Sequence, residues 1–159
     1  MSAGDYPFIP FRFHVNFTSV AVGGAGSGGG KTWEAAFSEC TGLEATMEPK
    51  VIKPGGSNYG AAQRVGPVTF GTVILKRGMT RNRSAWGFFS HVNELGKSAS
   101  RLNVKITVEA PADQDVSTAL TIELTRALPV KFKCADLNAR ASEVAIEELH
   151  LAHEGLSLK

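Results

Sequence analysis

Apolar and polar residues alternate along much of the chain with the two-residue period of a β-strand. The first such run covers 11–18, where aromatic and β-branched side chains take every second position. The next covers 33–38, and a glycine-rich segment joins the two runs. Because adjacent alternating runs linked in this way usually pair, we predict an antiparallel hairpin near the start of the chain.

Three further runs predict strands. Residues 68–76 carry apolar side chains on both faces, so we expect a strand that is partly covered on both sides. Residues 104–109 and 120–125 alternate strictly, and the turn formers of 111–114 lie between them. We expect Pro129 to interrupt the last strand, and 130–134 to continue the sheet beyond it.

One stretch has the period of an amphipathic helix. Asn82 or Ser84 can cap its start, and Gly96 can end it because glycine accepts the left-handed conformation there. The apolar side of this helix comprises Ala85, Phe88, Phe89, Val92 and Leu95. Trp86 lies beside the stripe, and we interpret it as a packing anchor. The residues expected to pack the helix onto the sheet are Trp86, Phe88, Phe89 and Val92.

The pattern near the C-terminus supports two predictions for 142–155. The composition favours a helix that Ser142 caps and Gly155 ends. The apolar alternation fits a bulged strand as well, because its phase shifts by one place between Ile146 and Leu149. The residues by themselves favour the helix slightly.

Two segments have no clear period. Residues 47–66 are rich in glycine and proline, and a structureless segment of this length is usually functional or disordered. Tyr59, Gln63 and Arg64 are its side chains best suited to contact a partner, and the alternative is a mobile surface loop. Residues 23–30 are mostly glycine and predict a flexible hairpin connection.

Length and composition are those of one globular domain spanning 1–159, with 43% hydrophobic and 20% charged residues. The net charge of +2 gives little electrostatic grip on nucleic acid. We see no secretory signal at the N-terminus and no apolar run long enough to anchor the chain in a membrane. We therefore expect Cys40 and Cys134 to be reduced core thiols, and a disulfide between them is the alternative.

Candidate chemistry is sparse. Gly30, Lys31 and Thr32 end the glycine run like a phosphate-binding loop, but such a loop should open a helix, and the residues after Thr32 alternate instead. Nucleotide binding through Lys31 and Thr32 is therefore the weaker alternative. The histidines have no zinc-binding spacing, and no nucleophile has a catalytic setting. We expect no metal, no cofactor and no enzyme activity.

Several blocks, taken in order, carry a family pattern. Residues 37–43 have a phenylalanine, an acidic residue, a small pair, a glycine and a leucine, and 73–80 have a strand-and-turn pattern. The other blocks are 6–7 with 11–15, 55–59, Trp86, 127–131 and 145–156. Over nearly its full length, the chain resembles the tail-tube proteins of contractile phages and the inner-tube proteins of contractile injection systems. It departs from them in its order Gly66-Pro67 and in its long run at 23–30.

The resemblance implies a mainly β fold, a β-sandwich or open barrel of antiparallel strands with one α-helix packed on the outside. It also implies that 142–155 are a strand, and we follow it over the preference for a helix. Strands of six subunits would join into one ring barrel, which removes the open edges and is too wide to be filled by side chains. We therefore expect a homo-oligomer of hexameric rings that stack into a tube.

The resemblance implies the contacts and partners as well. The segment 47–66 would make subunit and ring-stacking contacts through Val51, Ile52, Lys53, Tyr59, Gln63 and Arg64. Partners would be sheath, baseplate and tube-terminator proteins, with protein effector or DNA as cargo in the lumen. The chain would be made in the bacterial cytoplasm and assembled into a phage tail or a phage tail-like particle. The alternative within the family is a specialised ring at the baseplate end of the tube.

Overall fold

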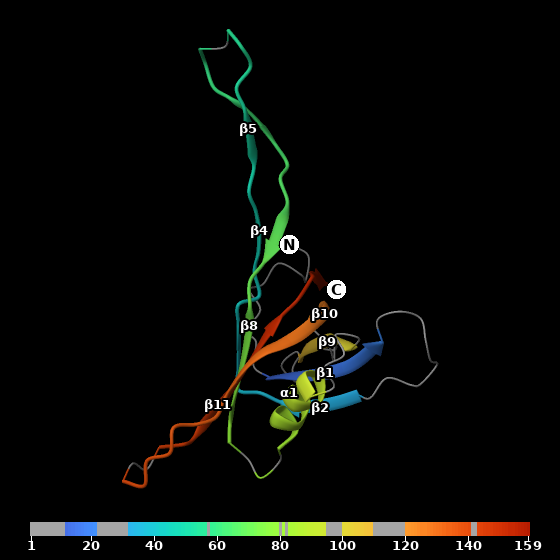
Figure 1. Ribbon diagram of the computed structural model, residues 1–159, viewed down its shortest axis with the longest axis vertical. Helices are drawn as coiled ribbons and strands as arrows, with labels where there is room; N and C mark the ends of the chain where they lie inside the picture. Colours follow the sequence, from blue (N-terminus) through green and yellow to red (C-terminus); the bar gives the residue numbers. More distant parts are fainter. Residues whose placement is uncertain are drawn as a thin grey trace, which may run out of the picture.

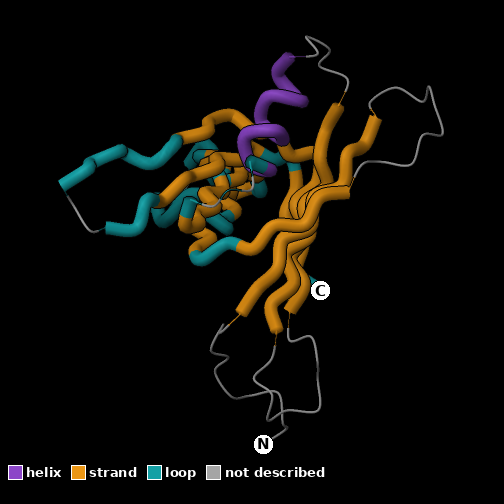
Figure 2. Tube along the Cα trace, turned by 90° about the horizontal axis from the view of Figure 1, so that it is seen from below, coloured by secondary structure: helices purple, strands orange, loops and turns teal. Residues whose placement is uncertain are grey.

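The computed structural model describes residues 12–21, 32–56, 58–79, 81, 83–94, 100–109, 120–140 and 143–159. Its described part consists mostly of antiparallel strands, with one helix against them (Figures 1 and 2). The glycine-rich run at 23–30, with its expected flexible connection, lies outside these residues.

The predicted N-terminal hairpin is confirmed. Strand β1 (Arg12–Ala21) pairs antiparallel with β2 (Thr32–Ala36) on one edge and with β9 (Ser100–Glu109) on the other. The alternation of 11–18 has a simple cause, since Val15 and Phe17 are buried while Asn16 and Thr18 are only half-buried.

A long strand, β10 (Leu120–Lys133), lies at the centre of the sheet. Its first half pairs with β9 and β12 (Gly155–Leu158), and its second half pairs with β11 (Ile146–Ala152). Strand β8 (Val73–Gly78) pairs with β11, and β3 (Glu39–Thr41) pairs with β8. The order is β2-β1-β9-β10-β11-β8-β3, with β12 beside β10.

The preference of the residues for a helix at 142–155 is wrong, and the strand implied by the resemblance is confirmed. Within β11, Glu147, Leu149 and Leu151 are buried and alternate with less buried residues. Pairing to β10 and β8 on both edges outweighs the weak intrinsic propensity of this segment for a helix.

Pro129 does not interrupt its strand, contrary to expectation. Strand β10 continues through it, and a register shift between Pro129 and Lys131 accommodates the missing N–H. A second shift, between Leu124 and Ala127, contains Arg126 with a φ of 52°. Near this bulge, the strand that pairs with β10 changes from β12 to β11.

Strands β2 and β3 are neighbours in sequence but lie at opposite ends of the strand order. Only Phe37 and Ser38 separate them, and the Ser38 N–H donates to the Lys76 carbonyl over 2.8 Å. The sheet is therefore strongly curved, yet one chain does not form a closed barrel. The expected open arrangement of antiparallel strands is confirmed at this level.

Helix α1 (Ser84–Glu94) covers the core of this curved sheet. Phe88 is buried, and its ring centroid lies 4.7 Å from that of Phe17 and 5.3 Å from that of Trp33. The first helical turn closes from the Gly87 N–H to the Arg83 carbonyl, so Arg83 takes the N-cap position expected for Asn82 or Ser84.

The segment 47–66 is not structureless, contrary to expectation. It lies within an arm, 45–70, in which β4 (Ala45–Met47) pairs with β7 (Val68–Phe70) and β5 (Lys50–Ile52) with β6 (Ala62–Arg64). This arm projects far from the body along the long axis of the molecule (Figure 1). The single strand expected over 68–76 is accordingly divided into β7 and β8.

Candidate assembly surfaces

The arm carries all six residues predicted to make subunit and stacking contacts, and each of them is exposed. Apolar side chains are prominent among them, with Val51 57% and Tyr59 99% exposed. In the β5–β6 ladder, Val51 lies opposite Gln63, while Lys50 lies opposite Arg64. Apolar side chains grouped on a projecting ribbon are typical of a binding surface.

Close backbone contacts hold the base of the arm. A Cβ atom on Gly66 would lie 1.7 Å from the Glu48 carbonyl oxygen, so no larger residue fits there without a shift of the backbone. The Gly71 N–H donates to the Glu44 carbonyl over 3.1 Å. Gly42 has a φ of 81° and packs directly against the Thr72 carbonyl. The direction in which the arm leaves the sheet is therefore fixed by its backbone.

The outer half of the arm is basic. Lys50, Lys53 and Arg64 lie on it, and no Asp or Glu occurs from 49 to 71. Among the described residues, none of these three cations has an ion-pair partner. An acidic surface on a partner would therefore complement the arm.

Open strand edges are the second candidate surface. Within the described part of the chain, β2 pairs only with β1, β3 only with β8, and β12 only with β10. Each leaves one row of backbone N–H and carbonyl groups without a strand beside it. Such edges are places where another chain can add a strand.

A buried ion pair ties β8 to β11 next to the β3 edge. Arg77 Nε contacts Glu147 Oε1, and the two side chains are only 8% and 10% exposed. The guanidinium carbon of Arg77 also lies 5.7 Å from the centre of the Phe37 ring. Sequence reasoning missed this pair, because the two residues are 70 positions apart and each sits in an ordinary strand pattern.

The four helix residues singled out from the sequence have different surroundings. Phe88 is buried, Val92 packs against the core, and Phe89 is half-buried. Trp86 is 51% exposed, with its ring 5.9 Å from Phe89 and 5.6 Å from Phe132. Trp86 therefore belongs to an aromatic surface group rather than to the core.

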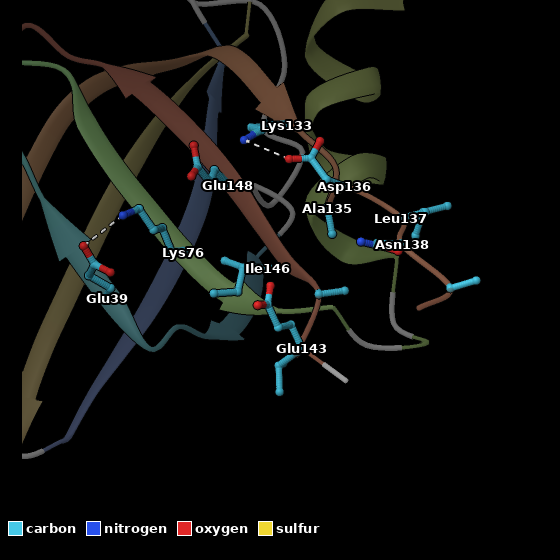
Figure 3. A pocket seen from close by; sticks show the side chains of 13 residues that line it. Glu39, Lys76, Lys133, Ala135, Asp136, Leu137, Asn138, Glu143, Ile146 and Glu148 are labelled. Carbon is cyan, nitrogen blue, oxygen red and sulfur yellow. Dashed lines mark hydrogen bonds and ion pairs between the residues drawn. The ribbon is translucent and has the colours of Figure 1, made fainter. Parts of the chain in front are cut away.

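A groove of about 640 Å³ lies at the far end of the body from the arm, and sequence reasoning did not find it (Figures 1 and 3). The strands β3, β8 and β11 form one side, and Lys133, 135–139 and 143–145 form the other. Carboxylates and lysines line it together with apolar residues. Its charged residues are Glu39, Lys76, Lys133, Asp136, Glu143 and Glu148.

Both lysines of the groove are already paired with carboxylates. Lys76 Nζ lies 3.1 Å from Glu39 Oε1, and Lys133 Nζ lies 3.7 Å from Asp136 Oδ2. A hydrogen bond with His150 lowers the pKa of Glu148, and the nearby lysines lower it further, so this carboxylate is charged at neutral pH. Glu143 is exposed and has no ion-pair partner among the described residues. The groove is therefore negatively charged overall.

The described residues hold no group of three or more potential metal ligands. Their one helix is too short and too polar to cross a membrane. Thr32 begins strand β2 and not the helix that a phosphate-binding loop would open, while Lys31 lies outside the described residues.

Both cysteines are free thiols, but only one of them fits the expected core position. Burial raises the pKa of the Cys40 thiol to about 11. Cys134 follows the end of β10 and is exposed, so its assignment to the core is wrong. The apolar residues before it had suggested a buried strand position.

Comparisons with known proteins agree over nearly the full chain. The family model for T4-like virus tail tube protein gp19 matches residues 9–157. A chain in the cryo-EM structure of the anti-feeding prophage (AFP) baseplate, 6-fold symmetrised, is 25% identical at a TM-score of 0.78, covering 98% of this chain and 97% of that chain. No curated protein matches in sequence.

More distant structures share the fold. A chain in the PVC sheath-tube complex of an extracellular contractile injection system, in its extended state, is 16% identical at a TM-score of 0.73, covering 98% of this chain and 93% of that chain. The crystal structure of Hcp protein is 11% identical at a TM-score of 0.52, covering 93% of this chain and 90% of that chain. At these identities the likeness concerns the fold alone.

Proposed function

The chain belongs to the T4-like virus tail tube protein family, and we propose that it is the inner-tube subunit of a contractile tail or injection machine. The observation that carries this proposal is the family match over residues 9–157, which includes the arm and the open strand edges. In this function the protein acts as a structural part and not as an enzyme.

Six copies form a ring in this proposal. Neighbouring copies complete one another's sheet at the open edges of β2, β3 and β12, because unpaired backbone groups there are satisfied by a strand from the next chain. A barrel with so many strands encloses a lumen that side chains do not fill. The 6-fold symmetry of the AFP baseplate structure that contains a 25% identical chain supports this copy number.

The rings stack into a tube through the arm. Val51, Ile52, Lys53, Tyr59, Gln63 and Arg64 make the subunit and stacking contacts. Their exposure on a ribbon that extends well beyond the body of its own chain supports this role (Figure 1). The helix lies on the side away from the channel.

The tube works mechanically. A sheath contracts around it and drives it through a target envelope, while cargo, either a protein effector or DNA, occupies the lumen. The chain is made in the bacterial cytoplasm and joins sheath, baseplate and tube-terminator proteins in a particle. Structural relatives named for a sheath-tube complex, a terminating cap and a baseplate support this set of partners.

The alternatives from the sequence gain no support. The structural relatives include tube, cap, terminator and baseplate chains alike, so they do not favour a specialised ring at the baseplate end. A phosphate-binding loop should be followed by a helix, but strand β2 begins directly after Lys31, so nucleotide binding gains no support.

Electron microscopy of the purified protein tests the proposed function. We expect rings at low protein concentration and hollow rods at high concentration. Particles without a central hole at every concentration would overturn the proposal. Counting copies of the chain in an isolated particle then separates a main tube subunit, present in every ring, from a specialised ring.

A further inference from the structure

We propose that the groove between strands β3, β8 and β11 on one side and Lys133, 135–139 and 143–145 on the other is the acceptor for the basic arm of a copy in the neighbouring ring. The proposal rests on the proposed function, because it requires stacked rings. It names a partner for each surface: the occupant of the groove is the arm of another copy of this chain.

The two surfaces lie at opposite ends of the molecule. The arm extends from one end of its long axis, and residues 135–139 and 143–145, which form one wall of the groove, lie toward the other end (Figure 1). A protein with a projection at one end and a receiving surface at the other assembles head to tail, with every copy in the same orientation. The arm cannot reach the groove of its own chain.

Charge is complementary between the two surfaces. The arm presents Lys50, Lys53 and Arg64 without ion-pair partners among the described residues. In the groove, four carboxylates outnumber two lysines, and those lysines already contact Glu39 and Asp136. The carboxylates that line the groove therefore attract cations, and its two lysines are held in ion pairs.

Exposed apolar side chains are present on both surfaces as well. Along the groove, Leu137 is 85% exposed and Val144 is 76% exposed, while Val51 and Tyr59 are exposed on the arm. Docking would remove these apolar side chains from water, which favours association. The charges then give orientation, and the apolar contacts add affinity.

Charge reversal of each surface, alone and together, tests this pairing. The groove variant is Asp136→Lys with Glu143→Lys, and the arm variant is Lys53→Glu with Arg64→Glu; all four side chains are exposed, so folding is preserved. We expect each variant to form rings but at least tenfold fewer rods than the unaltered chain. The chain with all four substitutions should form rods again.

The fourfold variant is the matched control, because it has the same net charge as the unaltered chain. Rods that form equally well in the groove variant, or a fourfold variant no better than the groove variant, would overturn the acceptor while leaving the tube function standing. An unaltered chain that forms neither rings nor rods would overturn the tube function, and the acceptor with it. Raising the salt concentration should also separate the rods into rings, since screening weakens the attraction.

Discussion

Replacing Gly42 and Gly87 with alanine should change the stability of the protein in opposite directions. Gly42 has a φ of 81°, and a Cβ atom there would lie 2.0 Å from the Thr72 carbonyl oxygen, whereas a Cβ on Gly87 meets nothing within 4 Å. We expect Gly42→Ala to lower the free energy of unfolding by at least about 2 kcal/mol. Gly87→Ala, in the exposed helix, should raise it by up to about 1 kcal/mol. Thermal unfolding of both variants checks this, and equal shifts would contradict it.

The buried pair of Arg77 and Glu147 should matter far more than any surface pair. Glu147→Gln keeps the volume but replaces the carboxylate beside the buried guanidinium with a neutral amide, so we expect a loss of about 3 kcal/mol in the free energy of unfolding. The control is Glu123→Gln, which removes an exposed pair with Lys159 and should cost less than about 1 kcal/mol. Urea unfolding of the unassembled subunit measures both, and similar losses would refute the distinction.

The two cysteines should differ in reactivity. The thiolate is the reactive form, and with a pKa of about 11 only about one Cys40 side chain in a thousand is ionised at pH 8. Cys134 is exposed. We therefore expect iodoacetamide to add one group per native chain at pH 8, and none on the same timescale after Cys134→Ser. Rapid modification of Cys40 in that variant would show that its strand is not packed as described.

At the scale of elements, prediction from sequence succeeded where a strand has one buried face. The alternation that indicated β1 and β2 reflects burial of Val15, Phe17 and Phe37 in the core. It failed for β4, β5 and β6, since both faces of these strands are exposed and no apolar period marks them. It also failed at Pro129 and at 142–155, where pairing with neighbouring strands outweighs local preference.

The arm should be dispensable for folding. Replacing 53–61 with Asn-Gly joins Ile52 to Ala62, which lie opposite one another, by a two-residue turn. Because the arm contributes nothing to the core, we expect an unchanged thermal unfolding midpoint. Rings should persist without rods, as electron microscopy would record. A shortened chain that unfolds at lower temperature, or still forms rods, would contradict this role.

At the scale of the whole molecule, the candidate surfaces were predicted only in part. Tyr59, Gln63 and Arg64 were singled out from the residues themselves, and the family resemblance added Val51, Ile52 and Lys53. The structure places all six together on one projection. The groove could not be predicted, because its walls come from β3, β8 and β11 together with 135–139 and 143–145, and no local pattern links them. The curvature of the sheet, which brings its two end strands β2 and β3 close together, likewise depends on the complete strand order.

The central claim is that this chain completes its sheet with other copies of itself, and native mass spectrometry tests it most directly. The account predicts a discrete species of six times the 16.9 kDa chain, with multiples of it as rings stack. Raising the protein concentration should increase those multiples without populating other copy numbers. A single 16.9 kDa species at every concentration would contradict the account.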